Sequence, residues 1–287
     1  MTQLAERLGL ERELDVLREG ETSCIDSGGS SRKSVSDVTV TPYRWICLIE
    51  TKTDQESAIR RSTGLLIGMR HVLTAGHVVY RKRAKFEKVV VKPGARSSGP
   101  GVEIASRNRF VLSAYRSKES SADDLGAIEL SNDVQSRVKT ALNLRFFGDP
   151  GPRKLAYAMG LYPTDHILGL PNVTDAQLRT MKVTSIGYPG DQRRSFDAMY
   201  EVEGSIRAIN RERGIADVVM DACTGQSGGP VFLFHDNDNY LIGVVASIHL
   251  PTALAQVALL TPPRVDALRG GVKKPLFTGP LPARDDG

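Results

Sequence analysis

The chain from about residue 35 onward is a series of short apolar runs separated by turn residues. Ten of these runs have the length and the β-branched composition of strands. They lie at Arg44–Glu50, Gly64–Gly68, His71–Thr74, Lys88–Lys92, Ala127–Leu130, Val183–Gly187, Tyr200–Ile209, Ala216–Met220, Pro230–Phe234 and Leu241–Ser247. Two short helical stretches are expected as well, at Ala176–Thr180 and near Arg264–Arg269. This pattern indicates an all-β sandwich or a pair of barrels.

Both ends of the chain depart from this pattern. Leucines at helical spacing among Glu and Arg predict one amphipathic helix over residues 3–18. Residues 19–34 are small and polar without periodicity, which predicts a flexible linker. The helix is either a docked or frayed extension or a regulatory arm. Residues 270–287 are rich in Gly and Pro and are expected to be a disordered tail.

Composition narrows the class of protein. The chain is 40% hydrophobic and 25% charged, as in an ordinary soluble globular protein. It holds no run approaching the roughly 18 apolar residues of a spanning helix. A net charge of +5 permits contact with nucleic acid without requiring it.

The three cysteines, Cys24, Cys47 and Cys223, are an odd number at scattered spacings. We therefore expect neither a disulfide framework nor a zinc cluster. Cys223 is expected to be a small buried residue without a disulfide partner, ahead of the alternative of a reactive thiol. The first twenty residues lack the apolar core of a secretory signal, so we expect a cytoplasmic location.

A candidate nucleophile stands in the run DACTGQSGGPVF, residues 221–232. A nucleophilic serine needs exposure, a tight turn and backbone N–H groups directed at the developing oxyanion. Ser227 is flanked by Gly225 and Gly228, at which no Cβ blocks the approach of a substrate. The run could equally be a glycine-rich turn between two strands.

A candidate general base stands in GLLIGMRHVLTAGHVVY, residues 64–80. Small neighbours at the end of a strand-like run could hold the ring of His77 in one orientation, as a base requires. The alternative is a histidine satisfied within the core.

The run SADDLGAIEL, residues 121–130, supplies a candidate partner for the histidine. Asp124 directly precedes an apolar run, and a buried carboxylate is costly unless it is paired. Asp123 lies one residue further from that run and fits the surface better. A capping or turn aspartate is the alternative reading.

The chain order His77, Asp124, Ser227 is that of the chymotrypsin-type triad. TAGHV, DLGAIEL and GQSGGPV resemble the histidine, aspartate and serine boxes of trypsin-like serine peptidases. The run SIGYPGDQRRSFDAMYEVEGSI, residues 185–206, resembles the GYPGD segment of the bacterial glutamyl-endopeptidase (V8-like) branch. The upstream LPNVTDAQLRTMKV and the early VSDVTVTPYRWICLIE are similar to that branch too.

The resemblance implies two six-stranded antiparallel β-barrels, preceded here by the N-terminal helical extension. The expected parts are residues 1–34 (helix and linker), 35–145 (first barrel), 146–269 (second barrel) and 270–287 (tail). Ser227 would attack the scissile carbonyl, His77 would carry the proton and Asp124 would orient His77. The N–H groups of Gly225 and Ser227 would form the oxyanion hole.

The same resemblance places the specificity pocket at Asp221, Ala222, Thr224, Val245 and Ala246. Asp221 stands where trypsin selects a basic P1 side chain. The glutamyl branch also carries an Asp there, followed by a threonine and completed by a pocket histidine. This chain has Ala222 and Val245 at those two positions, and His249 is four residues too late. Basic P1 and small or apolar P1 are expected equally, ahead of acidic P1.

The expected function is a serine endopeptidase that acts on a protein or peptide without metal or cofactor, gated by residues 1–34 or a partner bound there. The alternative is a peptidase fold retained as a protein-binding module. Gln226 replaces the trypsin Asp that receives a freed N-terminus, which argues against that zymogen switch. The basic run at 81–96 is interpreted as a solvated loop with one strand, and HDNDNY, residues 235–240, as a hairpin turn rather than a calcium loop.

Overall fold

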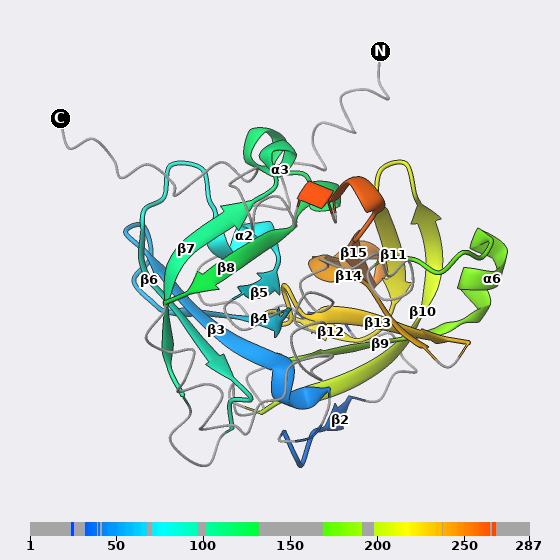
Figure 1. Cartoon of the computed structure of the whole chain (residues 1–287), viewed down its shortest axis with the longest axis horizontal. Helices are drawn as coiled ribbons and strands as arrows, with labels where there is room; N and C mark the ends of the chain where they lie inside the picture. The colour runs from blue at the N-terminus through cyan, green and yellow to red at the C-terminus, as the bar shows by residue number, and fades with distance from the viewer. Residues whose placement is uncertain are drawn as a thin grey trace.

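Two β-barrels lie side by side in the computed structural model (Figure 1). The structure describes residues 24–25, 32–38, 40, 42–67, 71–96, 102–131, 169–190, 198–236, 238–264 and 266–267. The expected N-terminal helix, the expected tail and the expected boundary at residue 145 lie outside these residues. None of the helices in the described part is long and apolar enough to cross a membrane.

The first barrel closes in the strand order β3-β4-β5-β8-β7-β6. Its strands are β3 (Ile46–Thr53), β4 (Arg60–Leu66), β5 (His71–Thr74), β6 (Phe86–Pro93), β7 (Ile104–Val111) and β8 (Gly126–Leu130). All six pairings are antiparallel. A short 3-10 turn, η2 (Tyr43–Trp45), leads into β3, so this strand begins two residues later than its apolar run predicts.

The second barrel has the strand order β11-β15-β14-β13-β9-β10 and closes through the pairing of β10 with β11. Its strands are β9 (Lys182–Gly187), β10 (Tyr200–Asn210), β11 (Ile215–Val219), β13 (Pro230–His235), β14 (Asp238–His249) and β15 (Leu254–Leu259). The short helix α6 (Asp175–Thr180) precedes β9, with a capping box between Thr174 and Gln177. The prediction of two six-stranded barrels is confirmed.

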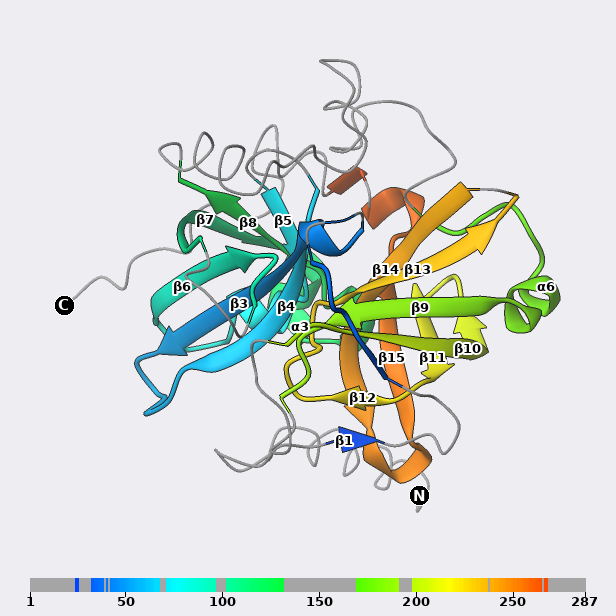
Figure 2. The ribbon, with the colours of Figure 1, turned by 90° about the horizontal axis from the view of Figure 1, so that it is seen from below.

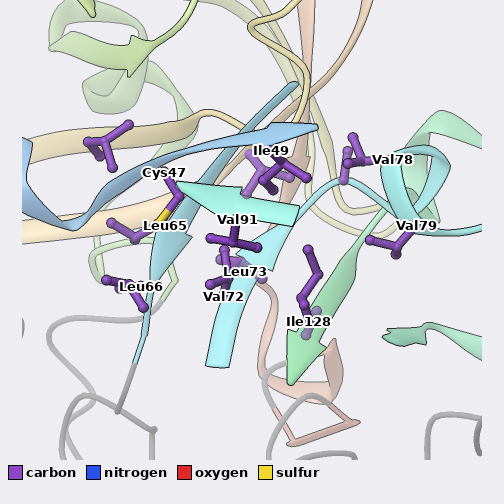
Figure 3. Packing of buried hydrophobic residues seen from close by; sticks show 14 of the residues in the cluster. Cys47, Ile49, Leu65, Leu66, Val72, Leu73, Val78, Val79, Val91 and Ile128 are labelled. Atoms are coloured by element: carbon purple, nitrogen blue, oxygen red, sulfur yellow. The ribbon is translucent and has the colours of Figure 1, made fainter. Parts of the chain in front are cut away.

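Buried apolar side chains fill the first barrel and extend to the segment that carries His77. Figure 3 shows this core, with Cys47, Ile49, Leu65, Leu66, Val72, Leu73, Val78, Val79, Val91 and Ile128 labelled. Val78 and Val79 belong to α2 (Gly76–Val79), a single helical turn directly after β5. Because these two valines are buried in the core, α2 is fixed on the barrel, and His77 on the same turn stays half-exposed.

Two strands of the barrels, β7 and β15, were not predicted from the sequence. The apolar pattern is interrupted in β7 and continuous in β15, so neither shows the alternation expected of a strand. In β7, the residues Ser106–Arg109 are polar and half-exposed or exposed, so they break the apolar pattern. In β15, apolar residues on both faces are buried, so no period of two is visible. The hairpin expected at residues 235–240 is confirmed, since His235 pairs with Asp238.

The expectation of a flexible linker over residues 19–34 is wrong at residues 24–25 and 33–34, which form short strands. The strand β1 (Cys24–Ile25) pairs with β12 (Ala222–Cys223), as Figure 2 shows. The strand β2 (Lys33–Ser34) pairs with β10. Each strand is two residues long, which is too short to produce a hydrophobic period. The small polar composition therefore concealed two points of attachment to the second barrel.

The expectation that the cysteines form no disulfide is also wrong. Cys24 and Cys223 are joined by a disulfide, with their Cα atoms 4.1 Å apart. The pairing of β1 with β12 brings these two residues directly opposite each other. They lie 199 residues apart in the chain, so their spacing gave no sign of the bond. Cys47 is the free cysteine, buried in the first barrel.

Candidate active site

The imidazole of His77 is held by the carboxylate of Asp124. Asp124 follows the 3-10 turn η3 (Ser121–Asp123) and lies two residues before the start of β8. Its Oδ2 lies 2.6 Å from His77 Nδ1, and its Oδ1 accepts the backbone N–H of His77 at 2.8 Å. The two hydrogen bonds fix both the backbone and the ring of His77. Gly76 makes this approach possible, because a Cβ there would lie 3.0 Å from Asp124 Oδ1.

The donor and the acceptor in the hydrogen bond between His77 and Asp124 follow from the chemistry of the carboxylate. An ionised carboxylate can only accept hydrogen bonds, so Nδ1 carries the ring hydrogen and Nε2 of the neutral ring keeps its lone pair. Asp124 is buried, with 5% of its side chain exposed, whereas His77 keeps 29% exposed. The arrangement is therefore suited to proton acceptance at Nε2 on the solvent side.

The neighbouring Asp123 has a different partner. Its Oδ1 accepts a hydrogen bond from Arg264 Nη2 at 2.7 Å, an ion pair between the two barrels. The same guanidinium donates to the backbone carbonyls of Arg213, Gly214 and Leu259. The structure thus places Asp124 on the histidine and Asp123 on an arginine.

Two consecutive tight turns carry Ser227. In the first turn the N–H of Gln226 donates to the carbonyl of Cys223 at 3.0 Å. In the second, the N–H of Gly229 donates to the carbonyl of Gln226 at 2.8 Å. The third residue of each turn is a glycine with positive φ, +96° at Gly225 and +80° at Gly228. Such backbone angles favour glycine at these turn positions, which explains the two glycines that flank the serine.

The same turns fix the direction of two backbone N–H groups. The carbonyl of Thr224 accepts the N–H of Gly190 at 2.6 Å, and the carbonyl of Gln226 accepts that of Gly229. In a trans peptide the C=O and N–H point opposite ways, so the N–H groups of Gly225 and Ser227 point away from these partners. Neither N–H donates to an acceptor within the described ranges. They are free to receive an oxyanion.

The serine turns rest against the strands that lead to His77. Thr63 in β4 donates its backbone N–H to the carbonyl of Ser227 at 2.9 Å and its hydroxyl to the carbonyl of Gly225 at 2.7 Å. The carbonyl of Thr63 in turn accepts the hydroxyl of Thr74 at 2.7 Å. A Cβ on Gly228 would lie 2.8 Å from the backbone nitrogen of Ala75. The serine and histidine segments are therefore joined through buried backbone contacts, and both reactive side chains stay half-exposed.

Of the predicted pocket residues, Ala222 lies in β12, Val245 and Ala246 lie in β14, Asp221 directly precedes β12, and Thr224 belongs to the first serine turn. Asp221 and Ala222 are buried, while Thr224 is exposed. Val245 exchanges backbone hydrogen bonds with Gly228 and Gly229, and its side chain is buried in the core of the second barrel. Ala246 lies at a β-bulge in β14 and is buried. His249 lies beyond them, with its Nδ1 2.7 Å from the hydroxyl of Thr252.

Two residues of the site were missed at the sequence level, Thr63 and Tyr188. Besides its contacts with the serine turns, the Thr63 hydroxyl accepts the N–H of Tyr188 at 3.0 Å. The Tyr188 hydroxyl donates to the carbonyl of Ala95, so this side chain bridges the two barrels. Tyr188 belongs to the GYPGD run, which was the available signal. No comparable signal marks Thr63, because its role is to bind backbone groups.

Several basic side chains of the run at 81–96 pair with carboxylates. Arg81 pairs with Glu56. The carboxylate of Glu50 binds Lys88, Lys92 and Arg61. Burial alone would raise the pKa of Glu50, but these cations outweigh it and hold that pKa below its ordinary value. Within the described ranges no three His, Cys, Asp or Glu side chains are grouped to hold a metal ion.

Comparison with known proteins agrees with this geometry. The family model described as Trypsin matches residues 35–262. A glutamyl endopeptidase of Bacillus licheniformis is 32% identical over 208 residues, or 71% of this chain, but the match spans only 54% of that protein's length.

Solved structures show the same fold. A Glu endopeptidase in complex with MPD superposes with a TM-score of 0.61 at 22% identity, over 83% of this chain and 95% of that one. The protease Anisep of Arthrobacter nicotinovorans gives a TM-score of 0.53 at 14% identity, over 80% of this chain and 94% of that one. The chain therefore belongs to the trypsin family and has the chymotrypsin fold.

Proposed function

We propose that the protein is a serine endopeptidase that cleaves peptide bonds through Ser227, His77 and Asp124. The observation that carries the proposal is the His77–Asp124 pair, with its 2.6 Å contact at Nδ1, beside a serine on two glycine turns. This pair leaves Nε2 of His77 as the acceptor on the exposed side.

The proposed reaction runs in two halves. Ser227 Oγ attacks the scissile carbonyl while His77 Nε2 takes the hydroxyl proton and passes it to the leaving amine. The C–N bond breaks and an ester to Ser227 forms. Water then loses a proton to His77 and attacks the ester, and the proton returns to Ser227 Oγ as the acid leaves. The N–H groups of Gly225 and Ser227 stabilise the oxyanion in both halves, and Asp124 stabilises the imidazolium.

The proposed P1 preference is for a basic or a small to apolar side chain, ahead of an acidic one. The relative named glutamyl endopeptidase favours the acidic choice by its name. Against it, the Val245 side chain is buried in the second barrel and offers no hydrogen-bond donor to a substrate carboxylate. A peptide library with varied P1 residues distinguishes the three classes, and cleavage after Glu alone would overturn this ranking.

Two further proposals concern the N-terminal region and the compartment. Gating by residues 1–34 is tested by removing residues 1–22, which leaves Cys24 in place, and by removing residues 1–34. A rate and a partner binding unchanged in both variants would contradict gating. The expected cytoplasmic location competes with an oxidising compartment, which the Cys24–Cys223 disulfide favours. Trapping the thiols of the protein in its native cells with an alkylating agent distinguishes the two locations.

The test of the proposed chemistry is labelling with a fluorophosphonate probe, followed by peptide cleavage. We expect the full chain to be labelled, and both Ser227→Ala and His77→Ala to abolish labelling. Ser117→Ala is the matched control, because Ser117 is an exposed serine on α3 (Ser113–Lys118) whose hydroxyl donates to the carbonyl of Ala114. A folded wild-type chain that neither reacts with the probe nor cleaves peptides would refute the proposal in favour of a binding module.

A further inference from the structure

The disulfide between Cys24 and Cys223 attaches an N-terminal segment beside the proposed nucleophile. Cys223 is the last residue of β12 and lies four positions before Ser227. Figure 2 shows β1 alongside β12 at the lower edge of the molecule, and the register pairs Cys24 with Cys223 and Ile25 with Ala222. Ile25 is buried, with 3% exposed, in the same apolar cluster as Ala222 and Met220. Residues 24–25 are thus integrated into the second barrel by a covalent bond, a backbone ladder and apolar burial.

Cys223 is also the first residue of the turn that presents the Gly225 N–H. Its carbonyl accepts the N–H of Gln226, and its own N–H donates to Gln226 Oε1 at 2.6 Å. The N–H of Gly225 belongs to the central peptide of this turn. A displacement of Cys223 therefore shifts the central peptide of the turn, and with it the Gly225 N–H that is the proposed oxyanion donor.

The conformation of this turn is destabilised by a buried amide nitrogen without a partner among the described residues, so contacts with the rest of the barrel are needed to hold it. Gln226 is 1% exposed, and its Nε2 is buried without a hydrogen-bond partner in the described part of the chain. A buried amide with unused donors disfavours the conformation that holds it. On the Gly225 side, two hydrogen bonds hold the turn: the Thr224 carbonyl accepts the N–H of Gly190, and the Gly225 carbonyl accepts the hydroxyl of Thr63. On the Cys223 side, the disulfide and the β1–β12 ladder are the corresponding constraints.

We propose that Cys24 is a positioning residue for the oxyanion hole, acting through its disulfide with Cys223. This inference rests on the proposed peptidase function. With the disulfide intact, the Gly225 N–H is held ready for the transition state. With the disulfide broken, the Cys223 end of the turn is loosened and the donor is displaced part of the time. Because an oxyanion donor acts in the transition state, kcat falls and KM changes little.

The attachment is redox-sensitive by its chemistry. A dithiol such as dithiothreitol supplies two electrons and two protons, the S–S bond breaks to give the thiols of Cys24 and Cys223, and the reagent closes to its own cyclic disulfide. Oxidised glutathione reverses the reaction by accepting the two electrons. The activity of the enzyme therefore depends on the oxidation state of these two residues.

The experiment compares the wild type, oxidised and reduced, with Cys24→Ser and Cys47→Ala. Active sites are counted by end-point fluorophosphonate labelling, and kcat is expressed per reactive serine. Unfolded protein therefore does not lower the measured kcat. We expect kcat per site to fall about tenfold in the reduced wild type and in Cys24→Ser, below the 10²–10³ of a lost donor, with KM within about twofold. Dithiothreitol should have no further effect on Cys24→Ser, while Cys47→Ala should respond like the wild type.

Hydrogen exchange of residues 221–229 supplies a readout independent of activity. Reduction should accelerate exchange of the Cys223 and Gln226 amides, and reoxidation should restore both their protection and kcat. Unchanged exchange on reduction, or an unchanged kcat per site in an active enzyme, would overturn the inference. An oxidised wild type that neither labels nor cleaves would instead overturn the proposed function, and the exchange data would still decide whether the disulfide positions the turn.

Discussion

Replacing Thr63 with valine tests whether one hydroxyl joins the two barrels at the serine turns. The substitution keeps the shape of the side chain and removes the oxygen. It leaves the carbonyl of Gly225 and the N–H of Tyr188 without the partners that they have at 2.7 and 3.0 Å. Both residues are buried, so water cannot easily replace the hydroxyl. A buried polar group without a partner costs about 1–3 kcal/mol, so the two together cost about 2–6 kcal/mol.

The measurement is equilibrium unfolding in urea, with every variant carrying Ser227→Ala to prevent autolysis. We expect Thr63→Val to lower the unfolding free energy by that amount, a large part of the roughly 5–15 kcal/mol of a typical domain. Thr63→Ser keeps both hydrogen bonds and loses one methyl group, so it should cost only about 1 kcal/mol.

Thr53→Val is the matched control for this prediction. Thr53 is a buried threonine in β3 whose hydroxyl has no partner among the described residues. The same substitution should therefore leave stability unchanged or raise it slightly, because no hydrogen bond is lost. If Thr63→Val and Thr53→Val unfolded at the same urea concentration, the energetic role assigned to the Thr63 hydroxyl would be refuted.

Three further predictions follow from single residues. Gly225→Ala places a Cβ against the carbonyl of Tyr188 at a φ of +96° and should lower kcat at least 100-fold. The control Gly94→Ala has a φ of +54° and its nearest contact at 3.6 Å, so it should cause only backbone strain. Equal activities of the two variants would contradict this prediction. Asp124→Asn should lower kcat about 10⁴-fold and Asp123→Asn only a few-fold; the reverse order would reassign the pair. The lowered pKa of Glu50 predicts stability that is present above about pH 4.3 and lost as pH falls through its folded value, so Glu50→Gln should flatten the acid limb of urea unfolding measured from pH 6 to 3. Parallel acid limbs would refute that.

How much of the site could be predicted depends on whether a residue acts through its own side-chain chemistry. His77, Asp124 and Ser227 could be selected because each combines a reactive group with small or apolar neighbours in a short segment. Gly225 and Gly228 could be selected because a positive φ restricts the choice of residue. Thr63 could not be found, because it acts on backbone groups far away in the sequence, and any buried residue with a hydroxyl would look the same.

The errors in the fold have a related physical origin. Local apolar periodicity predicted ten of the barrel strands, and β11 shows it clearly by its alternation of buried and half-exposed residues. It left a sandwich and a pair of barrels open, and the family resemblance selected the two barrels. Residues 24–25 and 33–34 lack such a period, and the contacts that order them are made with partners about 170–200 residues away. A non-local contact leaves no trace in local spacing, so the disulfide was missed together with the two strands.

The attachment of residues 24–25 and 33–34 to the second barrel also sets the order in which the molecule can be completed during synthesis. The strands of the first barrel pair only with one another, so that barrel can close while the ribosome is still making the second. Cys24 must wait for Cys223, a separation of 199 residues that takes about 10–40 s at common elongation rates of roughly 5–20 residues per second. The disulfide beside the proposed nucleophile can therefore form only after both barrels have been largely synthesised, which makes it one of the last bonds of the fold.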